Sequence, residues 1–326
     1  MSSGISNANE RRLVLVSGRA HPQLAEEVAE ALGTELLPTD AYTFANGELY
    51  IRFGESVRGT DAFVLQSHAT PINKSIMEQL IMVDALKRAS AARITVVAPC
   101  YGYARQDKKH RGREPISARL MADLFKTAGA HRIMAVDLHT AQIQGFFDGP
   151  VDHLWAMPLL AQYVRTRVAP DNLTVVSPDA GRVRLADQWS DFLGAPLAII
   201  HKRRDPSVPN QVRVHELVGE VEGRTCVIVD DMIDTGGTIV QAAEALFEND
   251  AKEVIVASTH GLLSGPAVER LRDSRITEVI VTDTLPIADE KRFDGLTVLS
   301  IAPLIARAVR EVFDDGSVTS LFAGNS

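Results

Sequence analysis

The chain has 326 residues, enough for two domains of ordinary size, with 45% hydrophobic and 23% charged residues. Its 34 basic and 42 acidic side chains give a net charge of −8, which argues against a general nucleic-acid-binding protein. No apolar run approaches the ~20 residues that a membrane-spanning helix needs. The polar start, Met1 to Glu10, lacks the apolar core of a signal peptide, so we expect a disordered lead-in and a cytoplasmic protein. Cys100 and Cys226 lie at strand-like positions, which predicts buried thiols in a reducing compartment.

The first half of the chain alternates between strand-like and helix-like patterns. Pro22 opens a helical pattern that ends at Gly33. Alternation of strands with helices is typical of a parallel sheet covered by helices on both faces. The predicted strands are 13–16, 48–53, 62–66, 94–98 and 132–136, and the predicted helices are 22–32, 72–88 and 116–127.

The pattern restarts around Asp152 to Pro158. The predicted strands are then 173–177, 197–201, 211–217, 226–229, 254–258, 278–282 and 298–301, and the helices are 159–168, 183–193, 239–247 and 303–313. In each half, a helix leads through a small turn into an apolar strand followed by a histidine, His139 or His260. We therefore expect a duplicated α/β domain, with domains at 1–155 and 156–302 and a tail at 316–326. A helix at about 303–315 is a candidate to pack on the first domain.

The segment from Thr225 to Thr238 carries the clearest chemical pattern. A buried strand, Cys226 to Val229, is expected to end at Asp230 and Asp231, and a glycine turn then leads into a helix. The backbone N–H groups of such a turn and the helix N-terminus suit a phosphate group. Carboxylates beside a phosphate repel it, so they indicate a second partner: sugar hydroxyls that donate hydrogen bonds to them, or a metal ion. The pattern predicts a sugar-phosphate site; the alternative is a turn in which an Asp caps the helix.

Other polar segments are ambiguous when each is considered alone. The basic loop from Tyr101 to Glu114 fits a mobile loop that closes over a polyphosphate, a solvated charged loop or a nucleic-acid-binding patch. His139 and Asp179 each follow a predicted strand, where α/β sites form, but both are also compatible with a structural role.

Two further segments have equally simple alternatives. Lys202 and Arg204 would face the same side of a strand and could address one developing negative charge, or they belong to an exposed charge run. The segment 44–48 contains Asn46-Gly47, a common turn dipeptide, and predicts a hairpin-type turn.

Taken in order, these segments resemble the ribose-phosphate diphosphokinase (phosphoribosyl-diphosphate synthetase) family. Thr225 to Thr238 alone is similar to the phosphoribosyl-diphosphate loop of the type I phosphoribosyltransferase fold. The resemblance covers essentially the whole chain, through 44–48, 103–107, 113–117, 137–147, 177–179, 202–204 and 225–238. It implies an α/β fold of two tandem type I phosphoribosyltransferase-like domains, each a mainly parallel sheet flanked by helices.

The resemblance also implies a reaction and its partners. The β,γ-diphosphoryl group of ATP would pass to the C1 hydroxyl of ribose 5-phosphate, giving phosphoribosyl diphosphate and AMP for nucleotide and amino-acid biosynthesis. Mg²⁺ is the implied cofactor. The family's assembly implies a homo-oligomer, usually a hexamer, without nucleic-acid or membrane partners. Its adenine loop is expected to reach ATP across a subunit interface.

Residue roles follow from the resemblance position by position. It implies catalytic roles for Lys202 and Arg204, and metal binding by His139 and Asp179. Because Mg²⁺ prefers oxygen ligands, His139 is the least typical of these and would suit contact through a water. The residues implied to bind ATP are Phe44, Asn46, Glu48, Arg105, Gln106 and His139. Those implied to bind ribose 5-phosphate are Asp230, Asp231, Asp234, Thr235, Gly236, Gly237 and Thr238, the first two through the ribose hydroxyls.

This chain departs from the family pattern at two places. Ala45-Asn46 stands where the family usually has Ser-Asp, so adenine recognition is expected to differ in detail. Arg182 stands where a second Gly is common, which affects the backbone near Asp179. The alternatives are a non-catalytic regulatory subunit, a phosphoribosyltransferase or a ligand-sensing repressor. The retained cations disfavour the first, and the acidic balance disfavours a repressor.

Overall fold

The structure, a computed structural model, describes residues 11–204 and 213–322, without the side chains of 202–204 and 213–215. The expected lead-in, Met1 to Glu10, and residues 323–326 of the expected tail lie outside the described residues. The chain divides into two compact units. Of the described residues, the first unit combines 11–154 with Ala302–Leu321, and the second contains Trp155–Ile301 and Phe322.

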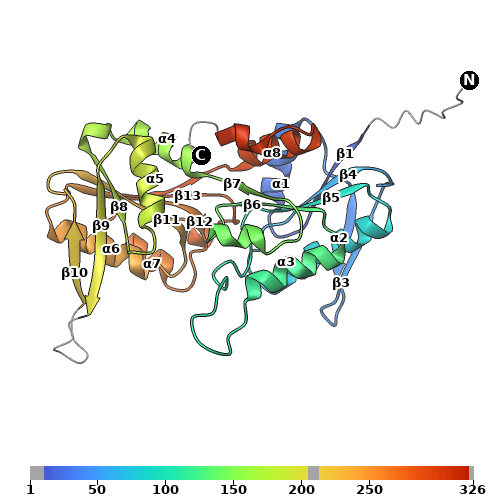
Figure 1. The fold of residues 1–326 in the computed structure, drawn as a ribbon, viewed down its shortest axis with the longest axis horizontal. Coiled ribbons are helices and arrows are strands. Elements are labelled where there is room, and N and C mark those ends of the chain that lie inside the picture. The colour runs from blue at the N-terminus through green and yellow to red at the C-terminus, as the bar shows by residue number, and fades with distance from the viewer. Residues whose placement is uncertain (1–10, 205–212, 323–326) are drawn as a thin grey trace, which may run out of the picture. The chain divides into compact units, whose positions relative to one another are not determined.

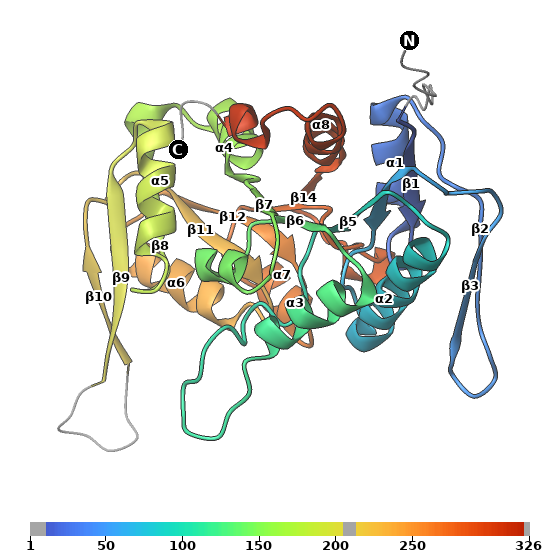
Figure 2. The same ribbon diagram turned by 45° about the vertical axis from the view of Figure 1, so that its right-hand side comes forward.

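The first unit is built on a 5-stranded sheet in the order β1-β4-β5-β6-β7, in which all neighbours are parallel. An antiparallel hairpin of β2 and β3 projects from this unit (Figure 2). The strands are β1 (Leu13–Ser17), β2 (Thr39–Thr43), β3 (Leu49–Phe53), β4 (Asp61–Leu65), β5 (Arg93–Ala98), β6 (Arg132–Val136) and β7 (Val151–Leu154). The sequence did not predict β2 or β7, because both are short and mostly polar or only partly buried.

Helices cover both faces of the first sheet. They are α1 (Pro22–Leu32), α2 (Ile72–Arg88), α3 (Ser117–Ala128) and α8 (Ala302–Phe313), with 3-10 turns η1 (Ala141–Gly145) and η4 (Val318–Phe322). The helices α1 and α8 pack together on one face, and α2 and α3 pack together on the other (Figure 1). Gly33 ends α1 in the left-handed conformation, with φ of 68°, as the sequence predicted.

The second unit contains a 7-stranded sheet in the order β10-β9-β8-β11-β12-β13-β14. All neighbours are parallel except β9 and β10. The strands are β8 (Leu173–Ser177), β9 (Leu197–Arg204), β10 (Arg213–Val218), β11 (Thr225–Ile233), β12 (Glu253–Gly261), β13 (Glu278–Thr282) and β14 (Leu296–Leu299). The chain leaves β8 toward β9 and later returns to pair β11 on the opposite side of β8. The strand order therefore reverses between β8 and β11.

The second sheet is also covered on both faces. Its helices are α4 (Met157–Arg167), α5 (Val183–Leu193), α6 (Gly237–Glu248) and α7 (Ala267–Arg272), with 3-10 turns η2 (Pro170–Asn172) and η3 (Asp289–Lys291). The helices α6 and α7 lie on one face, and α4 and α5 lie on the other (Figure 1). The predicted α/β class, with mainly parallel sheets flanked by helices, is confirmed.

Two smaller expectations concern single features. Cys100 and Cys226 are both buried free thiols, as predicted. Among the helices of the described ranges, none is long and apolar enough to cross a membrane.

A buried carboxylate joins the sheet of the first unit to the segment after α8. Asp61, 5% exposed at the start of β4, accepts hydrogen bonds from Arg11 Nη2 at 2.8 Å and from Arg93 Nε at 2.9 Å. Arg93 Nη1 also lies 2.9 Å from Asp315, which follows α8. One carboxylate between two arginines therefore fixes where the chain returns to this unit.

We expect Asp61→Ala to lower the free energy of unfolding by about 1–3 kcal/mol, because both arginines lose a buried acceptor but keep water contact. Urea denaturation measures the change. Glu55→Ala is the matched control: it removes an exposed partner of Arg12 and should cost less than about 0.5 kcal/mol. Equal losses in the two variants would contradict the importance of Asp61.

Candidate active site

The second unit has a candidate site where its strand order reverses. In open α/β sheets, ligands bind beyond the carboxyl ends of the strands at such a reversal. The segment after β8 contains Asp179 and Arg182, and the carboxyl-terminal part of β11 contains Asp230 and Asp231. The sheet topology thus brings two segments that are about 50 positions apart in sequence to the same edge.

The two carboxylates lie inside β11, so the expectation that the strand ends before them is wrong. The neighbouring strand β12 continues alongside, pairing Asp230 with Ser258 and Ile233 with Gly261. The side chains of Asp230 and Asp231 are 13% and 7% exposed. Two acidic groups are therefore held next to each other with little access to water.

Arg182 forms ion pairs with both carboxylates. Its Nε lies 2.8 Å from Asp230 Oδ1, and its Nη2 lies 2.7 Å from Asp231 Oδ1. The backbone N–H of Asp231 donates a further hydrogen bond of 2.8 Å to Asp230 Oδ1. Burial and the neighbouring Asp231 raise the pKa of Asp230 to about 8, and the guanidinium of Arg182 opposes this rise.

The loop that follows β11 leads directly into α6. Gly236 adopts the left-handed conformation, with φ of 74°, and precedes the first helical residue, Gly237. The helix thus begins two residues earlier than the sequence predicted. No side chain caps this helix start, and its first backbone N–H groups have no partner within the helix. Such a terminus can bind an anion such as a phosphate group.

The segment between β8 and α5 is fixed by local hydrogen bonds. Asp179 Oδ1 accepts from the backbone N–H of Gly181 at 2.8 Å, and the hydroxyl of Ser177 donates to Asp179 O at 2.8 Å. Arg182 then serves as the N-cap residue of α5. Asp179 is partly exposed at this turn, where a carboxylate can reach a ligand.

Lys202 and Arg204 belong to β9, which extends three residues beyond the predicted end of that strand. In this extension β9 pairs only with the antiparallel β10, with Lys202 opposite His215 and Arg204 opposite Arg213. Their side chains lie outside the described part of the structure. Their catalytic role therefore stays a prediction.

The first unit places Phe44, Asn46 and Glu48, the predicted adenine-binding residues, in the connection between β2 and β3. Phe44 N–H donates to Glu48 O at 2.7 Å, and Glu48 N–H donates to Asn46 Oδ1 at 3.2 Å. The amide oxygen of Asn46 thus accepts the same hydrogen bond that the carboxylate oxygen of an Asp could accept in this turn. Phe44 is 45% exposed and packs edge-on against Tyr42, with ring centroids 5.0 Å apart, so an aromatic face is presented to solvent.

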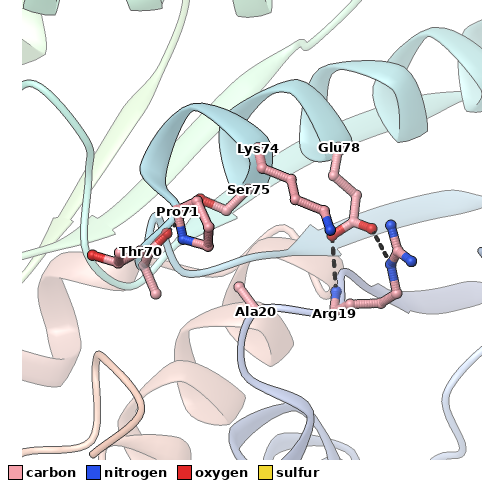
Figure 3. A pocket seen from close by; sticks show the side chains of 8 residues that line it. Arg19, Ala20, Thr70, Pro71, Lys74, Ser75 and Glu78 are labelled. Carbon is pink, nitrogen blue, oxygen red and sulfur yellow. Dashed lines mark hydrogen bonds and ion pairs between the residues drawn. The ribbon is translucent and has the colours of Figure 1, made fainter. Parts of the chain in front are cut away.

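A pocket of about 230 Å³ in the first unit contains the ion pair that anchors this hairpin. Figure 3 shows Arg19 bound to the carboxylate of Glu78 in this pocket, which Lys74 also lines. Glu78, 2% exposed, accepts from the backbone N–H of Arg19 at 3.0 Å and from its guanidinium. The same guanidinium lies 3.4 Å from Ala41 O and from Thr43 Oγ1 in β2. Arg19 therefore ties the hairpin to the sheet.

The basic loop between β5 and α3 is attached at its base by Asp107. This carboxylate is 4% exposed and accepts from Thr140 Oγ1 at 2.5 Å and from Gln142 Nε2 at 2.6 Å. Gln106 is held by the hydroxyl of Ser117 at 2.6 Å. Arg105 is exposed, as are the cations of the loop: Lys108, Lys109, Arg111 and Arg113. The loop thus combines a fixed base with an exposed cationic tip.

His139 lies in the turn after β6, which Asp107 contacts through Thr140. The preceding Asp137 has a positive φ of 37°, and Leu138 N–H donates to His153 Nε2 at 2.9 Å. Asp107 therefore joins the loop that contains Arg105 and Gln106 to the loop that contains His139, and both loops follow strands of the first sheet.

Sequence reasoning missed two residues that organise these loops. It treated Arg182 only as a backbone irregularity and did not single out Asp107. The available signals were an Arg three residues after the Asp that follows a strand, and a lone Asp within a basic loop. Neither signal shows which partner the side chain takes, because those partners come from other strands.

The residues that could hold Mg²⁺ are few. In the described ranges, no group of three or more His, Cys, Asp or Glu side chains could hold a metal ion by itself. Mg²⁺ commonly uses one or two carboxylates and completes its shell with substrate phosphates and water. Asp179, a partly exposed carboxylate, has donor chemistry that fits this mode, whereas a histidine does not suit direct contact.

Comparisons with known proteins cover nearly the whole chain. Residues 13–129 match the N-terminal domain of ribose phosphate pyrophosphokinase, and residues 200–323 match the phosphoribosyl synthetase-associated domain. A ribose-phosphate pyrophosphokinase of Streptomyces coelicolor is 69% identical over 320 residues, which are 98% of this chain and 99% of that one. That of Mycobacterium tuberculosis is 62% identical over 319 residues, 98% of each chain. A crystal structure of phosphoribosylpyrophosphate synthetase from Mycobacterium smegmatis matches with a TM-score of 0.89 at 60% identity, covering 94% of this chain and 100% of that one.

The raised pKa of Asp230 predicts a pH dependence of stability. The native carboxyl keeps its proton above pH 3.8, where the unfolded one loses it, so the native state binds more protons between about pH 4 and pH 8. The contribution of Asp230 to the free energy of unfolding is greatest below about pH 4 and is lost as the pH rises through its native pKa. Urea denaturation of the wild type and Asp230→Asn should show the wild type losing stability relative to the variant from pH 5 to pH 8. Parallel curves would contradict the shift.

Proposed function

We propose roles for individual residues of this chain, which belongs to the ribose-phosphate pyrophosphokinase family. The chain is an enzyme that transfers the diphosphoryl group of ATP to the C1 hydroxyl of ribose 5-phosphate and releases AMP. The observation that supports the residue assignment best is the pair of carboxylates a few residues before the glycine-started α6, at the reversal of the strand order.

The second unit binds ribose 5-phosphate. The 5-phosphate accepts hydrogen bonds from backbone N–H groups at the start of α6, within the segment Asp234, Thr235, Gly236, Gly237 and Thr238, where the helix dipole also favours it. Asp230 and Asp231 accept hydrogen bonds from the ribose hydroxyls. The sugar is then fixed at both ends, which orients its C1 hydroxyl.

The first unit supplies ATP-binding residues. Phe44, Asn46 and Glu48 at the hairpin tip bind the adenine, with the exposed ring of Phe44 as a stacking surface. Arg105 and Gln106, at the base of the basic loop, bind the nucleotide phosphates. His139 lies in the loop that Asp107 joins to the basic loop, and it contacts the nucleotide side of the site.

The reaction is an in-line displacement at the β-phosphorus of ATP. The C1 oxygen of ribose 5-phosphate forms a bond to that phosphorus, its proton leaves the hydroxyl, and the bond from phosphorus to the α,β-bridging oxygen breaks to release AMP. Positioning and charge stabilisation account for most of the catalysis in such transfers. Lys202 and Arg204 offset the negative charge that develops on the transferred group.

The resemblance assigns Mg²⁺ to His139 in the first unit and Asp179 in the second. The Asp179 carboxylate suits direct contact with Mg²⁺ and His139 suits contact through a water, and the ion would neutralise phosphate charge when bound. We also propose that the chain works as a cytoplasmic homo-oligomer, with a hexamer expected from the resemblance, and that the hairpin tip serves an adjacent subunit. Size-exclusion chromatography with light scattering tests the oligomeric state.

Phosphorus NMR of the purified chain with ATP, Mg²⁺ and ribose 5-phosphate tests the activity. AMP should appear together with a new diphosphate on the sugar. ADP formation would indicate an ordinary kinase instead. Binding without turnover would favour a regulatory subunit.

We expect Lys202→Ala to reduce kcat by about 100-fold or more, because it removes a cation that acts on the developing charge. Lys252→Ala, which removes an exposed lysine of the same unit, is the control and should leave kcat unchanged. Steady-state kinetics with circular dichroism separates catalysis from folding. Near-normal turnover of a folded Lys202→Ala protein would rule out the assigned role.

We expect Asp231→Ala to raise the KM for ribose 5-phosphate by about tenfold or more, with a much smaller change for ATP, because a charged acceptor for the sugar is lost. Asp289→Ala removes a fully exposed carboxylate of the same unit and serves as the control. The reverse pattern, with ATP affected more, would contradict the sugar assignment.

A further inference from the structure

We propose that Arg182 is a positioning residue that presents Asp230 and Asp231 to two neighbouring hydroxyls of the sugar, and so sets the preference of the site for a ribose over a deoxyribose. This inference rests on the proposed function for the identity of the sugar phosphate. The observation that carries it is one guanidinium bound to both carboxylates of the site.

The contacts of Arg182 fix the direction of both carboxylates. The Nε and Nη2 atoms of a guanidinium are held in one plane, so binding Asp230 at 2.8 Å and Asp231 at 2.7 Å sets the two acids in a fixed relation. Each contact uses Oδ1. A carboxylate has about four acceptor positions, so both groups retain capacity for hydroxyl donors.

The backbone explains why Arg182 can do this. As the N-cap residue of α5, it follows the tight turn in which Asp179 accepts from Gly181 N–H at 2.8 Å. Its backbone N–H also lies 3.3 Å from Asp179 O. The arginine side chain is 19% exposed and therefore held largely away from water, in contrast to Arg184 in the same helix, which is exposed.

The electrostatics require such a cation. Two adjacent carboxylates at 13% and 7% exposure repel each other, and without a counter-charge they would share a proton more tightly. A protonated carboxyl donates one of its hydrogen bonds and loses acceptor strength. The guanidinium of Arg182 opposes this proton uptake and so favours the acceptor form of the pair.

Two neighbouring hydroxyls match this arrangement better than one. Ribose 5-phosphate offers the 2- and 3-hydroxyls to the two carboxylates, whereas 2-deoxyribose 5-phosphate leaves one carboxylate without a sugar donor. A hydrogen bond to a charged group is among the stronger ones in proteins, so the loss should be measurable as a ratio of affinities. The 5-phosphate is common to both sugars and provides an internal reference.

The experiment is isothermal titration calorimetry of the full chain with ribose 5-phosphate and with 2-deoxyribose 5-phosphate. The Kd of the wild type for ribose 5-phosphate should be lower than its Kd for 2-deoxyribose 5-phosphate by about tenfold or more. In Arg182→Ala this ratio should fall to about twofold, because both carboxylates lose their fixed direction and take up a proton more readily.

Arg184→Ala is the matched control, because it removes an exposed arginine from the first turn of the same helix and should keep the wild-type ratio. Arg182→Gln is the second variant if Arg182→Ala does not fold; it keeps much of the side chain without the charge, and its ratio should also fall. A ratio that is unchanged in the folded variant, or tighter binding of both sugars, would overturn the proposal. Calorimetry measures binding, whereas the NMR test measures turnover, so the two proposals can fail separately. If the enzyme turns over but the affinity ratio of the two sugars is unchanged in Arg182→Ala, only the role of Arg182 is contradicted.

Discussion

The second unit depends on a constraint imposed by two adjacent buried acids. Asp230 and Asp231 repel each other in a place with little water, so the fold must supply a positive charge beside them. Arg182 supplies it from the start of α5, and the parallel pairing of β8 with β11 brings that helix start to the carboxylates. The left-handed Gly236 then turns the chain into α6, which places a positive helix end a few residues further on.

The topology of the two sheets explains why the candidate functional residues lie in different kinds of segment in the two units. In the second, the strand order reverses between β8 and β11, and open α/β sheets bind ligands beyond the carboxyl ends of the strands at such a reversal. The first sheet runs β1-β4-β5-β6-β7 without a reversal. Its functional candidates therefore lie on extensions from the sheet, namely the hairpin that Arg19 anchors and the basic loop that Asp107 anchors.

Sequence reasoning identified the α/β class, most strands and helices, and the family, because periodicity and motif order are local properties. The helix Ile72–Arg88 and the strand Leu173–Ser177 have their predicted bounds. It placed the acids after β11 instead of within it, because the length of a strand depends on its neighbour, here β12. It also missed the partners of Arg182 and Asp107, since tertiary contacts across strands leave no local pattern.

Arg182 also explains why an acidic pair can be buried at a binding site at all. One guanidinium beside two adjacent acids only partly offsets their repulsion, and holding the pair away from water costs free energy in the unliganded protein. The hydroxyl groups of a bound sugar donate hydrogen bonds to the two acids, so ligand binding offsets part of the desolvation free energy of the pair. A full neutralisation by a second cation would stabilise the fold more, but it would occupy the acceptors that the sugar needs. The single arginine therefore balances the stability of the unit against the recognition of its ligand.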